Sequence, residues 1–389
     1  MNLQFNPICL WRRAHKLFFL DSSDLNLAEK NLSRSQLTEK LENEVKRYFR
    51  VKHVVITSSG KEAIELVLKA LHLRKSENLI TQAFQCYDSL DMINKICKLN
   101  YTDTFNFDMS LQSLKKAINS NTRVIMPVNL YGIPSDVGGI SAICKKNKIF
   151  LLEDCAHSMG ALLDSKKVGT FGQASIFSFS KSLAAPAGGM IITNDSALYG
   201  KIRNLHKHSE VSTNYLSDFF GRLVLISMSS RLRNYQKVFP IALFFEKLQS
   251  IFRKSSHSLT NLEISLCLSQ FMKLDKINKE YVSKYKLFYS MLKGTQGINL
   301  FPYKPGQTAL RFPILFNEKK NIPVLLKKLY SSGCFEPSLN YNLEYRKALH
   351  LTNKKLENSD YLRDHLLVLS LDNLDVKSLK KIKYHISNF

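Results

Sequence analysis

Acidic residues are scarce in this sequence. It has 32 aspartates and glutamates against 56 lysines and arginines, which gives a formal net charge of +24 over 389 residues. Such a charge attracts nucleic acid, anionic lipid and phosphorylated small molecules. The lysines are spread along the chain, however, and no zinc finger, aromatic-rich RNA motif or basic-region helix accompanies them. The sequence therefore argues against nucleic acid as a partner.

Paired cysteines and long apolar runs are also missing. The seven cysteines are odd in number, widely spaced and without a CxxC pair, so we expect neither a metal site nor a disulfide framework. The apolar run Leu17–Leu20 is too short for a secretory signal. Val238–Phe245 is far shorter than the ~20 residues of a membrane-spanning helix. We expect a cytoplasmic protein, and contact with a membrane surface stays open.

Short apolar runs alternate with helical stretches from residue 51 onward. This texture predicts an α/β fold in which helices sandwich a mainly parallel sheet. In such sheets the ligand lies at the carboxyl ends of the strands. The strand-like runs are 53–57, 124–128, 150–153, 175–179 and 190–193.

The chain is long enough for two domains. We expect an N-terminal lead-in (1–35), a large domain (36–213), an insertion (214–256) and a smaller C-terminal α/β domain (257–389). The insertion mixes apolar clusters with seven basic residues between Arg222 and Lys254. It predicts either helices packed on the protein, within a subunit or across a dimer interface, or a surface that rests on anionic membrane.

Three segments carry residues suited to chemistry. The first is Thr57-Ser58-Ser59-Gly60-Lys61, where a strand passes through a turn of small residues into a helix. Free N–H groups at a helix start bind phosphate, and Gly60 lets an anion come close to the backbone. Taken alone, the segment fits a plain helix cap with Ser59 as the N-cap better than a binding site.

The second segment is a buried strand that ends in two acids, Glu153 and Asp154. An acid at the carboxyl edge of a sheet can bind a metal, a ribose or a protonated heteroaromatic nitrogen, and it can equally cap a helix. His157 follows three residues later, as a ligand contact or as an ordinary loop residue.

The third segment, from Phe177 to Leu183, contains Ser178 and Lys181 and precedes Gly188-Gly189. A loop of small residues between apolar strands is a poor place for a solvated cation, so Lys181 is a candidate amine nucleophile, although exposed loop lysines are commoner. Together the three segments supply a phosphate site, an acid for a ring nitrogen and an amine. Pyridoxal phosphate requires that combination.

These segments and the run from Val124 to Gly132 resemble the DegT/DnrJ/StrS family of sugar aminotransferases, well over residues 35–210 and loosely beyond. The resemblance implies the aspartate-aminotransferase fold (fold type I of pyridoxal-phosphate enzymes) and a homodimer. It also implies a transaminase of polysaccharide biosynthesis that aminates a keto-sugar linked to a nucleotide, with glutamate as the expected amino donor.

The resemblance also implies residue roles. Lys181 would bind the cofactor as a Schiff base and move the proton, and Asp154 would hold the protonated ring nitrogen. Relatives that dehydrate sugars carry histidine in place of this lysine, so Lys181 favours transamination. The implied cofactor contacts are Ser59, Gly60, Lys61, Phe84, Asp154, His157, Ser178 and Lys181.

The chain departs from the family pattern at several positions. Lys61 replaces the usual threonine, Asn129 the usual histidine and Ala187 the usual acid, and Lys181 follows Ser178 by only three positions. Cys86 occupies the place of the stacking aromatic, which leaves Phe84 or Tyr87 for that role.

Two further interpretations stay open. One is a pyridoxal-phosphate enzyme that acts on a different ketone, aldehyde or amino acid. The other is a catalytically idle relative that works as an interaction or membrane-surface protein.

Overall fold

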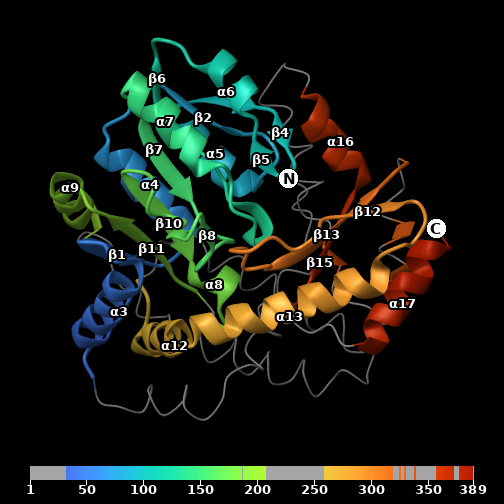
Figure 1. Cartoon of the computed structure of the whole chain (residues 1–389). Coiled ribbons are helices and arrows are strands. Elements are labelled where there is room, and N and C mark those ends of the chain that lie inside the picture. Colours follow the sequence, from blue (N-terminus) through green and yellow to red (C-terminus); the bar gives the residue numbers. More distant parts are fainter. Residues whose placement is uncertain are drawn as a thin grey trace, which may run out of the picture.

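The computed structural model describes residues 32–185, 187–206, 258–318, 324–325, 328–329, 337–338, 356–371 and 376–388. Two β-sheets surrounded by helices dominate this part of the chain (Figure 1). The lead-in up to residue 31 and the insertion 214–256 lie outside the described residues.

The large sheet has seven strands. All run parallel to one another except β11, which is antiparallel to both of its neighbours. The predicted, mainly parallel α/β sheet is therefore confirmed. In spatial order the strands are β1 (His53–Thr57), β11 (Gly189–Thr193), β10 (Ala174–Ser178), β7 (Phe150–Asp154), β6 (Thr122–Met126), β2 (Asn78–Gln82) and β3 (Lys98–Thr102).

Helices cover both faces of this sheet, which explains why strands such as β1, β7 and β11 contain continuous apolar runs rather than alternating ones. On β6, Val124 and Met126 face one cluster of buried side chains while Ile125 faces another. The first cluster lies under α4 (Gly60–Ala70), α5 (Tyr87–Ile96) and α9 (Ser196–His206). The second lies under α6 (Leu111–Ala117) and α7 (Val137–Asn147).

A third cluster joins α3 (Arg34–Phe49) to α12 (Asn261–Met272) on the large sheet. Helix α3 begins with a capping box in which the Ser33 side chain and Gln36 satisfy each other's backbone N–H groups. Its buried residues include Leu37, Leu41 and Val45, at the helical spacing seen in the sequence. Residues just beyond the predicted boundary at 257 thus pack on the large sheet, and the domain boundaries stay a prediction.

The small sheet has four antiparallel strands, in the order β12 (Ile298–Leu300), β13 (Arg311–Phe316), β15 (Leu366–Ser370) and β14 (Pro337–Ser338). Helices α13 (Leu274–Leu292) and α17 (Val376–Ser387) bury their apolar sides against it. No helix of the described residues has the length and apolar content needed to cross a membrane.

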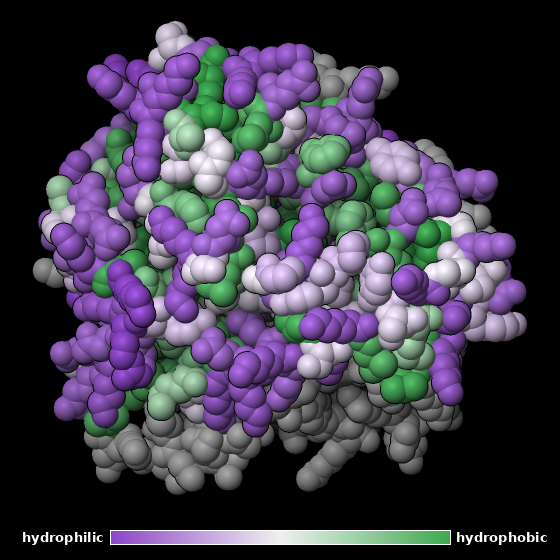
Figure 2. Space-filling view, viewed as in Figure 1, coloured by the Kyte–Doolittle hydropathy of each residue, from purple (hydrophilic) through white to green (hydrophobic). Residues whose placement is uncertain are grey.

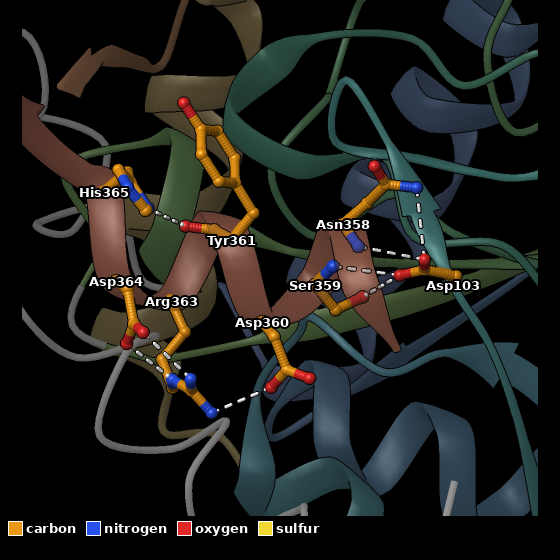
Figure 3. Close-up of polar contacts among 8 residues, drawn as sticks. All are labelled: Asp103, Asn358, Ser359, Asp360, Tyr361, Arg363, Asp364 and His365. Carbon is orange, nitrogen blue, oxygen red and sulfur yellow. Dashed lines mark hydrogen bonds and ion pairs between the residues drawn. The ribbon is translucent and has the colours of Figure 1, made fainter. Parts of the chain in front are cut away.

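Several hydrogen bonds among the described residues connect the small sheet and its helices to the large sheet, and α13 contributes one from Asn278 to the Met159 carbonyl at 3.0 Å. The carboxylate of Asp103 accepts hydrogen bonds from Asn358 and Ser359 in the first turn of α16 (Glu357–His365) (Figure 3). The Thr308 N–H donates to the carbonyl of Gly132 at 3.0 Å, and Leu162 N–H donates to that of Gly306 at 2.8 Å.

Candidate active site

The residues singled out in the sequence meet at one edge of the large sheet. Asp154 and Ser178 end the neighbouring parallel strands β7 and β10, and Ser59-Gly60 follows β1, which runs in the same direction. Carboxyl ends of parallel strands open on the same side, so strand direction alone brings these residues together.

The Ser59-Gly60 turn lies directly on the strand ends beside it. A Cβ atom on Gly60 would be 3.3 Å from the Ser178 Cβ, and one on Gly189 would be only 2.4 Å from the carbonyl carbon of Ser59. The Gly188 N–H also donates to the carbonyl of Ser58 at 2.9 Å. The glycines therefore allow the turn after β1 to reach Ser178, as a shared phosphate site requires.

The start of α4 leaves donors for an anion. Ser59 is the N-cap, and its hydroxyl accepts the Glu62 N–H at 3.1 Å. The N–H groups of Gly60 and Lys61, at the first turn, have no acceptor within the helix. The Lys61 side chain is exposed, so its backbone is the part that faces this turn.

Glu62 is a site residue that the sequence analysis missed. One of its carboxylate oxygens accepts both the N–H and the hydroxyl of Ser58, at 2.7 and 2.6 Å. These two hydrogen bonds hold Ser58 in the turn, and Ser59 occupies the N-cap position of α4. The available signal was the spacing Ser59-x-x-Glu62, which is the pattern of a capping box at a helix start.

Asp154 is a buried carboxyl at the end of β7. Its side chain accepts the Ala156 N–H at 3.0 Å, and burial raises its pKa to about 6. That hydrogen bond and the positive charge of Lys181 act in the opposite direction. A buried carboxyl of this kind is stabilised in its charged form by a cation placed beside it.

The neighbouring Glu153 faces a different environment. Its two oxygens accept the N–H groups of Gly169, Phe171 and Gly172 at 2.7–2.8 Å, in a fully buried position. Glu153 therefore fixes the loop that leads into β10, and of the two acids only Asp154 is coupled to Lys181.

His157 follows Asp154 by three residues and is buried. Its Nδ1 accepts the Tyr131 N–H at 3.5 Å, and the two rings lie roughly parallel with centroids 6.2 Å apart. Asn129 fixes the same corner, since its N–H and its side-chain amide donate to the Asp154 carbonyl at 2.9 and 3.2 Å.

Lys181 lies in α8 (Phe179–Ser182), a single helical turn directly after β10. It is half-buried, and the Ser178 and Ser180 hydroxyls beside it are 3.2 Å apart. Phe84 is fully buried in the cluster under α4 and α5, and Cys86 is the N-cap of α5. The stacking role of Phe84 stays a prediction, and the Tyr87 side chain lies outside the described residues.

These groups fit pyridoxal phosphate. The cofactor has a phosphate, a ring nitrogen that is basic enough to be protonated, and an aldehyde. The turn at Ser59-Gly60 against Ser178 offers N–H and hydroxyl donors, the buried carboxyl of Asp154 suits a positively charged ring nitrogen, and Lys181 supplies an amine within electrostatic reach of Asp154.

The profile of the DegT/DnrJ/EryC1/StrS aminotransferase family matches residues 24–374. The chain belongs to this family. Among its relatives is the UDP-N-acetyl-3-dehydro-α-D-glucosamine 3-aminotransferase of Acidithiobacillus ferrooxidans, 35% identical over 205 residues, which are 51% of this chain and 53% of that protein. The chain thus matches about half the length of the curated relatives it resembles.

Solved structures of the same fold include PseC of Helicobacter pylori, an aminotransferase of pseudoaminic acid biosynthesis. It has a TM-score of 0.75 and 20% identity over 95% of this chain and 96% of that one. E. coli GDP-4-keto-6-deoxy-D-mannose-3-dehydratase with bound hydrated PLP has a TM-score of 0.73 and 19% identity, over 94% and 97%. At such identities these likenesses establish the fold, which is the predicted fold type I.

Proposed function

We propose that this protein is a pyridoxal-phosphate-dependent aminotransferase. It transfers an amino group from an amino acid, with glutamate as the expected donor, to a keto-sugar linked to a nucleotide. The observation that carries the proposal is that the buried Asp154 and Ser178 end neighbouring parallel strands beside the Ser59-Gly60 turn, with Lys181 on the helical turn that follows Ser178. Membership of the aminotransferase family and a UDP-sugar aminotransferase among the relatives support the substrate class.

When bound, pyridoxal phosphate supplies an aldehyde that reacts with amines and a ring that accepts electrons. The chain's own groups would hold and orient it. Ser59, Gly60, the Lys61 N–H and Ser178 would bind the phosphate, and Asp154 would keep a proton on the ring nitrogen by pairing with it. Because Asp154 is buried, this ion pair would act in a site from which water is excluded.

Lys181 would anchor the cofactor and serve as the base that moves a proton at the α-carbon of the amino donor. A lysine on a short helical turn next to the strand ends suits both tasks. The fold holds its backbone, while its long side chain can change conformation. An enzyme that removes a sugar hydroxyl instead would need a different group here, and lysine is the residue that favours transfer.

A spectrum of the purified protein, followed by a donor screen, tests this proposal. Protein loaded with pyridoxal phosphate should be yellow, and glutamate should bleach the visible band and yield 2-oxoglutarate. Keto-sugar nucleotides should then restore the band. Bleaching by an amino donor with no response to any sugar nucleotide would favour a non-sugar substrate, and protein that takes up no cofactor would overturn the proposal in favour of a binding role.

We further propose that the enzyme acts as a homodimer in the cytoplasm and contacts anionic membrane. The basic stretch that first suggested the membrane lies outside the described residues. Helix α17 adds to this argument, since it has no acid and exposes Lys380, Lys381 and Tyr384. The face in Figure 2 is mainly hydrophilic, so any attachment there would be electrostatic rather than by insertion.

Light scattering after size exclusion tests the dimer, and a monomer mass at working concentration would exclude it. Co-sedimentation with vesicles tests the membrane contact. We expect binding to vesicles rich in phosphatidylserine, release by salt, and none to neutral vesicles. Absence of binding at low salt would leave only the packing role for segment 214–256.

A further inference from the structure

A short hairpin between β3 and α6 has an unusual turn. Strands β4 (Thr104–Phe105) and β5 (Asp108–Met109) pair antiparallel, and the two residues between them, Asn106 and Phe107, have φ values of 48° and 72°. Positive φ at both positions is the pattern of a type I′ turn, in which the second position favours glycine. A bulky aromatic residue is disfavoured at this position, so contacts of the Phe107 ring must stabilise its backbone conformation.

The Phe107 ring packs against one aromatic ring of the large-sheet part and one next to the small sheet. It is 2% exposed, packs edge-on against Tyr131 with centroids 5.2 Å apart, and lies 4.7 Å from the ring of Phe301, which precedes β13. Tyr131 is itself fully buried and has a φ of 60°. Two bulky residues with left-handed backbone thus pack against each other.

Tyr131 connects this contact to His157. Its N–H donates to Nδ1 of His157, and its ring lies parallel to the imidazole. A neutral imidazole that accepts at Nδ1 carries its proton on Nε2, so the direction of the Tyr131 peptide selects one tautomer. That direction depends on the left-handed backbone at Tyr131, against which Phe107 packs.

The hairpin itself is fixed at its ends and its tip. Asp103, at its start, binds the first turn of α16 (Figure 3). The Thr104 hydroxyl is 2.8 Å from that of Ser359. The Asp108 carboxylate accepts the Asp136 N–H, and Gln82 donates to the Phe107 carbonyl at 3.3 Å. These contacts hold Phe107 in place. Its ring therefore restricts movement of the Tyr131 side chain and backbone.

We propose that Phe107 is a positioning residue that holds Tyr131 in its left-handed conformation and thereby keeps His157 in the tautomer protonated on Nε2. Nothing in this coupling depends on bound cofactor. Its consequence for catalysis rests on the proposed function, together with a place for His157 beside the cofactor ring, which the family resemblance implies. A single tautomer would then present one defined hydrogen-bonding group to that ring.

Nitrogen NMR of ¹⁵N-histidine-labelled, cofactor-free protein tests the proposal. Loss of one pair of ring signals in His157→Gln assigns His157. We expect the wild-type signals to show an unprotonated Nδ1 and a protonated Nε2, and Phe107→Leu to shift them toward a mixture of tautomers. The matched control is Phe105→Ala, because Phe105 lies on the same hairpin but is 63% exposed. It should leave the His157 signals unchanged.

Unchanged His157 signals in folded Phe107→Leu protein would overturn the proposal, as would an equal shift in Phe105→Ala. Should Phe107→Leu fail to fold, Phe107→Met keeps an apolar side chain of similar length and serves as the second variant. In cofactor-loaded protein, Phe107→Leu should also move the pH midpoint of the visible band. A tautomer shift in protein that takes up no cofactor would leave the Phe107 role standing and reject the proposed function.

Discussion

At the scale of single residues, Lys181 is distinguished from the other lysines by its place on a turn beside Ser178 and Asp154. We expect Lys181→Ala to abolish transamination, because it removes both the cofactor anchor and the proton carrier, and to leave the fold intact. Borohydride reduction of wild-type protein with bound cofactor, followed by mass spectrometry, should place the label on the peptide that contains Lys181.

Lys69→Ala is the matched control for that variant. Lys69 lies on α4 and pairs with Glu65 on the surface, so its loss should change neither labelling nor turnover. A label on any lysine other than Lys181 would reject the assignment.

Asp154 is the second residue whose removal is informative. With cofactor bound, Asp154→Asn should retain the cofactor and lower turnover by ~10²-fold or more, because an amide cannot stabilise a positive ring nitrogen. Steady-state kinetics at saturating cofactor measure the effect. Turnover within a few-fold of wild type would contradict the ring-nitrogen role.

The same substitution should have the opposite effect on the cofactor-free protein. Asp154 has a pKa of about 6 in the fold and ~3.9 when unfolded, so its ionised form destabilises the fold above pH 6 by about 3 kcal/mol. This penalty disappears as the pH falls through 6 toward 4, where the folded carboxyl takes up a proton. Asp154→Asn should thus be more stable than wild type at pH 8, and the difference should shrink toward pH 4.

Urea unfolding of both proteins across this pH range measures that difference. The control is Asp91→Asn, since Asp91 is a surface acid paired with Lys95. It should show no comparable gain at pH 8. A destabilised Asp154→Asn protein at pH 8 would mean that burial of the charge costs little.

At the scale of elements, the approach of the α4 start to β10 and β11 determines whether a phosphate site exists. Gly189→Ala would place a Cβ atom 2.4 Å from the Ser59 carbonyl carbon, so the turn must move away from the strand ends. We expect weaker cofactor binding and a loss of ~1–3 kcal/mol in stability. Titration of cofactor-free protein, followed by absorbance, measures the first effect and urea unfolding the second.

Gly200→Ala is the matched control for this element. Gly200 lies in α9 with nothing within 4 Å of an added Cβ, so alanine should stabilise the helix by up to ~1 kcal/mol and leave cofactor affinity unchanged. Wild-type affinity in Gly189→Ala would show that the turn is not the phosphate site.

At the scale of the whole molecule, close backbone contacts are among the links between the two sheets. An added Cβ at Gly306 would lie 2.3 Å from the Leu162 carbonyl oxygen, across the junction, and Gly306 has a φ of +91°. Gly294 has a similar φ, +81°, but nothing lies within 4 Å of it. The pair therefore separates backbone strain from displacement of the sheets.

We expect Gly294→Ala to lose ~1–2 kcal/mol through strain alone, and Gly306→Ala to lose clearly more and to weaken cofactor binding. Thermal unfolding with and without cofactor measures both. Equal losses of stability in the two variants would show that the backbone at Leu162 can move away from residue 306 without a further loss of stability.

The sequence alone determined the features that depend on neighbours along the chain. Residues 150–152 of β7 are apolar because both faces of the sheet are covered, and Leu37, Leu41 and Val45 recur at helical spacing because one side of α3 is buried. Ser59 before a helix start predicts an N-cap, and the structure confirms it. The strand directions then bring Asp154 and Ser178 to one edge.

Only the tertiary structure decided which long-range contacts surround the sheet edge at Asp154 and Ser178. Asp103 caps a helix 255 residues away, Tyr131 adopts a left-handed backbone against Phe107, and Gly189 leaves room for the Ser59 turn. None of these contacts has a local pattern, because each joins segments that meet only once the strands have paired. Long-range packing can also hold a disfavoured backbone angle, whereas local preference in the sequence would predict against it.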